Sequence, residues 1–302
     1  MTKNKVNGWI NLHKPLGMSS AQAVGKVKWL LKPVKIGHAG TLDPLAWGVL
    51  PLALGEATKC VSLLMDAKKV YEFDVTFGER RATDDAEGEV VATSGYIPGA
   101  AEIQDVLPRF TGAITQTPPA YSAIKIDGQR AYALARAGDV VAMKPRQVMV
   151  FALELIPLAQ GEGAIASFRA TVSKGTYIRS LGRDIAQACG AEGYISRLHR
   201  VSVGPFSDKD AISLDFLEKS AHMAATSGAC TGWLLPLSVA LDDIPALSLS
   251  AQQAQILRHG QHPPITSPDL PLAAAMLDEQ MIGLVRVEAG RVIAQRLLNV
   301  DA

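Results

Sequence analysis

The stretch Gly37-His38-Ala39-Gly40-Thr41-Leu42-Asp43-Pro44-Leu45-Ala46 is the most informative part of this chain. Pro44 fixes its own φ and disfavours a helical backbone at Asp43, while Gly37 and Gly40 permit sharp turns or a close approach to a ligand. A rigid loop that presents one aspartate beside a histidine suits a nucleophile or a general base. Taken alone, the pattern is also that of an Asx turn, in which the carboxylate accepts hydrogen bonds from backbone amides.

The length and composition indicate a globular protein. A chain of 302 residues is long enough for one large domain and a small one. No apolar run approaches the roughly 20 residues of a membrane helix, and we find no secretory signal. Cys60, Cys189 and Cys230 lie far apart without a CxxC pair, which argues against a disulfide framework or a zinc site. We therefore expect a cytoplasmic protein that is not attached to a membrane.

Charge is unevenly distributed along the chain, although the net charge is only +1. Residues 1–69 carry a net +7, residues 122–150 a net +3 and residues 151–206 a net +2. Residues 70–121 and 207–302 are acidic, at −6 and −5. Basic segments of this kind can bind a phosphate backbone, but lysine-rich segments are also common on solvated surfaces.

Hydrophobic periodicity predicts interleaved strands and helices. We expect strands at 9–12, 49–54, 69–78 and 168–172, helices at 20–31, 55–65, 178–188, 207–240 and 250–257, and a terminal hairpin at 281–294. The irregular interleaving favours an α+β fold with a mixed sheet over a doubly wound one. We place a domain boundary near residue 240, which separates residues 1–240 from residues 241–302.

Five motifs occur in a characteristic order: Asn11–Gly17, Gly37–Pro44, Lys69–Tyr71, Gln116–Lys125 and Lys174–Leu181. Together they closely resemble the bacterial tRNA pseudouridine-55 synthase family, the B-type family of pseudouridine synthases. The resemblance spans about residues 8–206 and continues weakly to the end as a short module like the RNA-binding PUA domain. It implies a mixed, largely antiparallel central sheet flanked by helices, followed by a small β-rich PUA-like domain.

The resemblance implies an isomerase that converts the uridine at position 55 in the tRNA T loop to pseudouridine. The base is detached from C1′, rotated and rejoined through carbon, so we expect neither a cofactor nor a metal. The target base must first be flipped out of the folded tRNA, at a cost of a few kcal/mol. The expected partner is tRNA, bound at its T arm, and the protein is expected to be a monomer that needs no protein partner.

Three residues match the family's catalytic positions. Asp43 matches the catalytic aspartate, which can attack ribose C1′ or uracil C6 or remove a ribose proton; the sequence does not choose among these. Arg179 matches the active-site arginine and is expected to keep Asp43 ionised. Tyr71 matches the active-site tyrosine, whose ring can stack on the flipped uracil and whose hydroxyl can relay a proton. By pattern alone, Tyr71 would be a core aromatic on a strand.

Five further residues are expected to bind the substrate. His38 matches the histidine that inserts where the base leaves, while Tyr177 and Leu198 match positions that line the pocket. Lys14 is expected to position the catalytic loop or a phosphate. Asp85 is expected to contact RNA or to form a turn.

Two segments are expected near the RNA backbone. Residues 122–146 form a basic insertion that corresponds to a segment closing over the T arm, and Ser196–Arg200 could supply phosphate contacts. The chain departs from the family's pattern at Trp47, where a small residue is usual, at Tyr194, where histidine is usual, and at His199, where arginine is usual. The last two departures put the phosphate contacts in doubt, and Trp47 could alter packing or the approach of RNA.

Other functions fit parts of the same sequence. A non-catalytic RNA-binding or tRNA-folding protein on this scaffold is the main alternative, but the retention of Asp43, Tyr71 and Arg179 argues against it. A relative of the archaeal and eukaryotic enzymes that work with guide RNA and partner proteins is disfavoured by the short C-terminal module and the long basic insertion. A metabolic enzyme is disfavoured because the chain has no Gly-rich phosphate-binding fingerprint.

Overall fold

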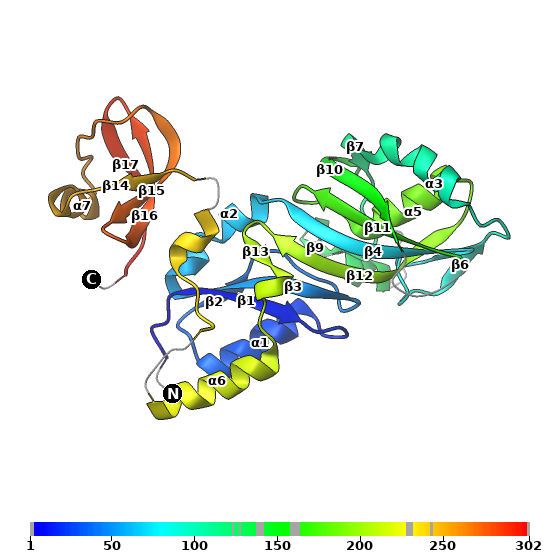
Figure 1. Cartoon of the computed structure of the whole chain (residues 1–302), viewed down its shortest axis with the longest axis horizontal. Coiled ribbons are helices and arrows are strands. Elements are labelled where there is room, and N and C mark those ends of the chain that lie inside the picture. Colours follow the sequence, from blue (N-terminus) through cyan, green and yellow to red (C-terminus); the bar gives the residue numbers. More distant parts are fainter. Residues whose placement is uncertain are drawn as a thin grey trace.

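The computed structural model of this chain describes residues 3–122, 124–126, 128–136, 142–157, 164–227, 232–241 and 244–300. Most of these residues surround one large sheet (Figure 1). Its strands are β1 (Gly8–Lys14), β2 (Ile36–His38), β3 (Ala46–Leu54), β4 (Lys69–Phe77), β7 (Gly112–Gln116), β10 (Arg146–Ile156), β11 (Ile165–Val172), β12 (Gly193–Val203) and β13 (Phe206–Ser207). The order is β1-β3-β12-β4-β11-β10-β7, with β2 beside β3 and β13 beside β12.

The sheet is mixed, as the sequence predicts. Strands β3 and β12 pair in parallel, while β12 pairs with β4, and β4 with β11, in antiparallel register. The predicted alternation along β4 is confirmed, because Phe73, Val75 and Phe77 are all buried on one face. Phe73 lies opposite Phe168 of β11, and their rings stack with centroids 5.3 Å apart.

Helices α1 (Ser20–Leu31), α5 (Ile178–Ala188) and α6 (Leu214–Ser227) pack against the sheet, with α1 and α6 side by side (Figure 1). Helix α1 begins at a capping box, in which Ser19 and Gln22 each satisfy the other's backbone N–H. Helix α5 buries Ile178, Leu181 and Ile185, as its helical spacing predicts. Its first turn therefore has a fixed position beside β4 and β12.

Two helix predictions were too long. Residues 55–65 form a 3₁₀ helix, η1 (Gly55–Lys59), and a short helix, α2 (Val61–Asp66), because the backbone at Cys60 breaks the helical pattern with ψ at 0°. Residues 207–240 contain η3 (Asp208–Asp210), α6 and η4 (Leu237–Leu241). After α6 the chain returns to the sheet, where Leu235 and Trp9 exchange two backbone hydrogen bonds.

The C-terminal residues form a separate small sheet (Figure 1). It contains β14 (Ala246–Ser248), β15 (Leu270–Leu277), β16 (Gln280–Glu288) and β17 (Arg291–Leu297), with α7 (Ala251–Arg258) capped by Ser250. The predicted hairpin is β16–β17. Lys59 Nζ donates to the Leu297 carbonyl at 2.9 Å, which ties this unit to η1. The boundary near residue 240 stays a prediction.

The remaining elements lie around the large sheet. They are two-stranded sheets β5 (Glu79–Arg81)–β6 (Val90–Thr93) and β8 (Lys125–Ile126)–β9 (Gln129–Arg130), with α3 (Ala100–Val106), η2 (Leu107–Phe110) and α4 (Ala131–Arg136). Within the basic insertion, residues 123, 127 and 137–141 are outside the described part of the chain. Cys60 and Cys189 are free thiols, and Cys230 is also outside it. No described helix has the length and apolarity needed to cross a membrane.

Candidate active site

A cavity of about 270 Å³ lies where the Asp43 loop (residues 37–46), β4, β12 and the start of α5 meet. Five residues predicted from the sequence line it: Asp43, Tyr71, Tyr177, Arg179 and Leu198. A larger cavity of about 560 Å³ lies between the N-terminal segment and the C-terminal unit, and none of the predicted residues lines it. The chemistry suggested by the sequence therefore belongs to the smaller cavity.

The Asp43 loop is anchored on both sides of its aspartate. Ser20 Oγ accepts from the Leu42 N–H at 2.8 Å and donates to the Leu42 carbonyl at 2.9 Å. On the other side, the Gly17 N–H donates to the Pro44 carbonyl at 2.8 Å. These contacts hold the backbone around Asp43 in place before any substrate arrives.

Arg200 is a third anchor of the loop, a role that no pattern in the sequence indicated. Its Nε donates to the Val49 carbonyl at 2.7 Å and its Nη2 to the Gly40 carbonyl at 3.0 Å. Arg200 is 1% exposed, and Arg197 is bonded to Asp74 through Nε at 2.6 Å. The expectation of phosphate contacts from Ser196–Arg200 is therefore wrong for Arg200, because a buried guanidinium that binds backbone carbonyls cannot reach a phosphate.

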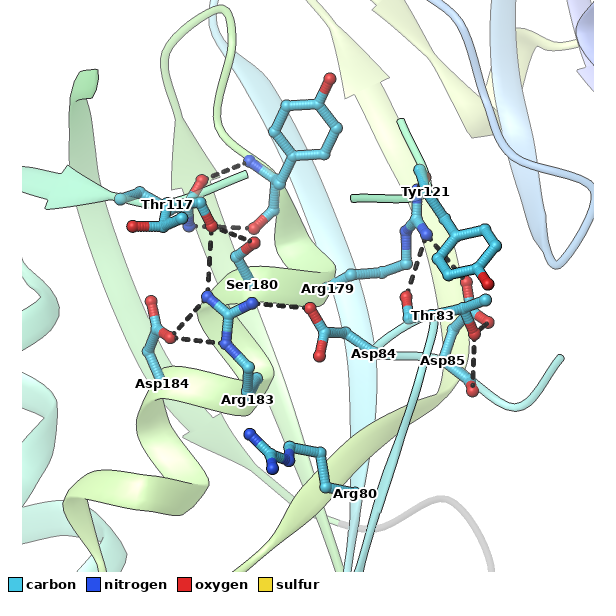
Figure 2. Close-up of polar contacts among 12 residues, drawn as sticks. Arg80, Thr83, Asp84, Asp85, Thr117, Tyr121, Arg179, Ser180, Arg183 and Asp184 are labelled. Carbon is cyan, nitrogen blue, oxygen red and sulfur yellow. Dashed lines mark hydrogen bonds and ion pairs between the residues drawn. The ribbon is translucent and has the colours of Figure 1, made fainter. Parts of the chain in front are cut away.

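Arg179 contacts two carboxylates, those of Asp43 and Asp85. Figure 2 shows its guanidinium beside Thr83, Asp85 and Tyr121. Its Nη2 lies 3.0 Å from Asp43 Oδ2, and its Nη1 lies 3.2 Å from Asp85 Oδ2. The same nitrogens donate to the carbonyls of Tyr121 and Thr83, at 2.8 and 3.0 Å. The Arg179 side chain is only 6% exposed, so it is a buried, positioned cation and not a surface arginine.

Asp85 lies outside the cavity lining, and its expected contact with RNA stays a prediction. Its side chain is 3% exposed and is enclosed by Arg179, the Thr83 hydroxyl and the Glu87 N–H. The alternative expectation, a residue in a turn, describes its backbone. Its carboxylate has a further role, because it fixes the guanidinium that contacts Asp43.

A second arginine on α5, Arg183, forms an ion pair with the neighbouring carboxylate, Asp84 (Figure 2). Arg183 Nη1 lies 2.7 Å from Asp84 Oδ2, and Arg183 also pairs with Asp184. Burial raises the pKa of Asp84, an effect that Arg183 opposes. Because Arg179 and Arg183 are one helical turn apart, they hold the consecutive residues Asp84 and Asp85 against one face of α5. The paired Asp-Asp and i, i+4 arginines were the sequence signal for this contact.

The other cavity walls come from aromatic and apolar side chains. Tyr71 is half-buried on β4, and Leu198 is 5% exposed on β12. Tyr177 precedes α5, and the Gln116 side chain fixes its backbone by accepting from its N–H at 2.7 Å and donating to its carbonyl at 3.0 Å. A flat base can therefore meet aromatic rings on rigid elements.

Lys14 and His38 do not line the cavity. Lys14 is fully buried and donates to the carbonyls of Pro15 and Met18, and burial lowers its pKa to about 8. Its contacts fix the turn beside the Asp43 loop, and the expected contact with a phosphate stays a prediction. His38 lies on β2, where burial and then the nearby Arg200 lower its pKa.

The departures Trp47 and His199 contact each other. They lie opposite one another on the parallel strands β3 and β12, with ring centroids 5.3 Å apart and planes 9° from parallel. His199 Nε2 lies 3.0 Å from Asp208, whose other oxygen is 2.7 Å from His13 Nδ1. Tyr194, the third departure, lies under the Arg81 guanidinium at 4.5 Å. None of these side chains lines the cavity.

Lys69 and Arg146 line the cavity but were not predicted as site residues. Lys69 Nζ binds carbonyls at the end of α2, those of Leu64 and Ala67 at 3.1 and 2.7 Å, and burial lowers its pKa to about 8. The available sequence signal for Lys69 was its position two residues before Tyr71, within the same motif. Within the described residues, no group of three or more histidine, cysteine, aspartate or glutamate side chains is arranged to hold a metal.

Comparison with protein families gives two matches. The family model described as TruB family pseudouridylate synthase (N terminal domain) matches residues 28–178. The model described as tRNA pseudouridylate synthase B C-terminal domain matches residues 179–242. The second match ends before the small C-terminal sheet begins at Ala246.

Curated relatives and solved structures match nearly the whole chain. The tRNA pseudouridine synthase B of Bradyrhizobium diazoefficiens is 46% identical over 98% of this chain and 87% of its own length. The tRNA pseudouridine synthase B of Rhodopseudomonas palustris is 45% identical over 98% of this chain and 82% of its own length. A chain of an H/ACA RNP bound to a substrate RNA has a TM-score of 0.75 at 24% identity, covering 97% of this chain and 85% of that chain. A chain of a Cbf5-Nop10-Gar1 complex has a TM-score of 0.72 at 27% identity, covering 98% of this chain and 84% of that chain.

Proposed function

This chain belongs to the TruB family of pseudouridylate synthases, and we propose that it converts the uridine at position 55 in the tRNA T loop to pseudouridine. It is an isomerase of tRNA uridine, like its curated relatives named tRNA pseudouridine synthase B. The position of the uridine and the residues that carry the reaction are the proposed parts of this function.

The observation that carries the proposal is the pairing of Arg179 with Asp43 at the cavity. The Asp43 side chain is 39% exposed, whereas the Arg179 side chain is 6% exposed. A carboxylate that faces the cavity is thus held at a fixed position beside a buried guanidinium. A positioned carboxylate that faces a cavity is what a nucleophile or a base requires.

The reaction is balanced without an added reagent. The N1–C1′ bond breaks and a C5–C1′ bond forms, while C5 loses a proton and N1 gains one. Asp43 acts on the ribose or the uracil ring, by attack at C1′ or C6 or by removal of a ribose proton. Tyr71 stacks on the flipped base and can relay the proton through its hydroxyl, and Tyr177 and Leu198 form walls of the same cavity.

The proposed mode of RNA binding follows the basic segments of the chain and the position of the cavity in the fold. The protein binds tRNA as a monomer, and the T arm lies over the cavity. His38 enters the space in the T loop that the flipped base leaves. Residues 1–240 form the synthase domain, and residues 241–302 form a PUA-like RNA-binding module. Because phosphate contacts release counterions, tRNA affinity should fall steeply as salt is raised.

The test is a turnover assay with a matched variant. Wild-type protein and Asp43→Asn are incubated with unmodified tRNA, and position 55 is scored for pseudouridine. We expect conversion by the wild type only, with tRNA binding similar in both proteins. Salt-sensitive tRNA binding without conversion by the wild type would overturn the proposal in favour of an RNA-binding or tRNA-folding protein. Normal conversion by Asp43→Asn would remove Asp43 from the reaction.

A further inference from the structure

The backbone and the side chain of Tyr177, on the cavity wall, are held by different groups. Gln116 accepts from the Tyr177 N–H at 2.7 Å and donates to its carbonyl at 3.0 Å, so the backbone is fixed. These bonds leave the side-chain torsions free, and a half-buried ring can occupy more than one rotamer. No described residue hydrogen-bonds the Tyr177 hydroxyl, so the orientation of the ring depends on another contact.

The guanidinium of Arg146 supplies that contact. Its carbon lies 4.6 Å from the centre of the Tyr177 ring, and both side chains line the cavity. A cation over the face of an aromatic ring is attracted by the ring's electrons, most strongly where water is excluded. In the other cation–ring pairs of the described residues, such as Lys68 over Phe151 at 4.6 Å, neither partner lines the cavity.

Arg146 is itself held in place. It is the first residue of β10 and lies opposite Gln116 of β7, so the residue that fixes the Tyr177 backbone is its neighbour in the sheet. The guanidinium also lies against Gly175, where an added Cβ would stand 3.7 Å from the guanidinium carbon. Its Nε and Nη2 are inaccessible to solvent. A ligand cannot reach these two nitrogens, whereas the Tyr177 ring beside the guanidinium lines the cavity.

We propose that Arg146 is a positioning residue for Tyr177, whose ring it holds in the orientation that meets the flipped base. The inference rests on the proposed function, because it assumes that a uridine enters this cavity. The guanidinium covers one face of the ring, which leaves the opposite face and the edge for the base. Arg146 thereby contributes to the chemical step and not to the affinity for tRNA.

The test is a double-mutant cycle between the cation and the ring. Single-turnover rates and dissociation constants for unmodified tRNA are measured for wild type, Arg146→Met and Arg146→Lys, each also combined with Tyr177→Phe and with Tyr177→Leu. Arg146→Met alone should lower the rate about 5- to 30-fold, with the dissociation constant within about threefold of the wild-type value. Arg146→Lys keeps a cation and should lose less. The loss should persist in Tyr177→Phe, which keeps the ring, and should fall below about twofold in Tyr177→Leu.

The matched control is Lys68→Met, which removes a cation at the same 4.6 Å distance from an aromatic ring outside the cavity. Its rate should stay within about twofold of the wild type. If Arg146→Met loses as much rate in Tyr177→Leu as in the wild type, or loses affinity in place of rate, the proposal is overturned, because Arg146 then contacts the RNA directly.

A second measurement reports on the ring without RNA. In protein with isotope-labelled tyrosines, the Tyr177 signals are assigned by their loss in Tyr177→Phe, and side-chain couplings give the population of each rotamer. We expect one rotamer in the wild type and in Lys68→Met, and averaging over several in Arg146→Met. A single rotamer in Arg146→Met overturns the proposal, and Arg146→Gln takes its place should that variant not fold. Absent conversion by the wild type overturns the proposed function, while these couplings still decide whether Arg146 holds the ring.

Discussion

Asp43 and Asp85 lie on the two terminal nitrogens of one guanidinium, at 3.0 and 3.2 Å from Arg179. The two carboxylates differ in exposure, because 39% of the Asp43 side chain and 3% of the Asp85 side chain are accessible. Asp85 is therefore the fixed end of this chain of contacts, and Asp43 is the end that faces the cavity. The geometry makes Arg179 a rigid link between the Asp84-Asp85 turn and the carboxylate proposed to react.

Removing the charge of Asp85 should impair turnover more than binding. In Asp85→Asn the Arg179 guanidinium loses its buried carboxylate but keeps the Tyr121 and Thr83 carbonyls. We expect kcat to fall about 10- to 100-fold, because small misplacement of a reacting group is costly, while KM for tRNA changes less than about twofold. The unfolding free energy should fall by about 1–3 kcal/mol. Single-turnover kinetics and denaturant unfolding measure both effects.

The control is Asp105→Asn, which changes an exposed aspartate on α3 that does not line the cavity. Its kinetics and stability should match those of the wild type. A rise in KM with unchanged kcat in Asp85→Asn would contradict the positioning role, since it would place Asp85 in direct contact with RNA.

Two adjacent serines separate loop anchoring from helix stability. Ser20 bonds both backbone groups of Leu42 in the Asp43 loop, whereas Ser19 caps α1. Ser20→Ala should lower the unfolding free energy by about 2 kcal/mol and reduce kcat. Ser19→Ala should cost about 1 kcal/mol but leave kcat within about twofold. Equal effects of the two variants on kcat would mean that the loop anchor has no special role.

The unfolding free energy should increase with pH between about 8 and 10.5 because of the buried lysine Lys69. Burial lowers its folded-state pKa from 10.5 to about 8. Between these values the unfolded chain binds a proton that the folded protein has lost, so the unfolding free energy increases with pH in this window. In Lys69→Met that contribution is absent, and the difference between wild type and variant should grow in favour of the wild type from pH 8 to 10. Urea unfolding at several pH values tests this, and parallel curves would contradict it.

Trp47 should support local packing and not catalysis. It stacks on His199, and the Arg197 guanidinium lies 5.9 Å from its ring. Trp47→Ser, which restores the small residue usual in the family, should lower stability by roughly 1–3 kcal/mol and leave turnover within about twofold. Trp29→Ser is the matched control, since Trp29 is 68% exposed and its loss should change stability by less than about 0.5 kcal/mol. A large change in turnover by Trp47→Ser would place its ring on the path of the RNA.

Much of the fold could be predicted from local patterns. Strand β4 and helix α5 were recognisable because their apolar residues repeat at intervals of two and of three to four. The break at Cys60 was not, because no glycine or proline stands there to end a helical pattern. The end of α6 at Ser227 did have a local signal, since Gly228 follows it, and the predicted helix 207–240 ran past that glycine. The pairing of Leu235 with Trp9 depends on residues far apart in the chain, so no local pattern predicts it.

The sequence by itself determined the family, because the family rests on residue types in a fixed order, and it singled out Asp43, Tyr71 and Arg179 as the proposed catalytic residues. Only the tertiary structure decided which groups Asp85 and Arg200 contact. Asp85 and Arg200 are buried charges whose partners lie 94 and about 150 residues away along the chain, at Arg179 and Val49. Burial and pairing of charge depend on contacts between distant segments, and no local pattern of residues encodes them.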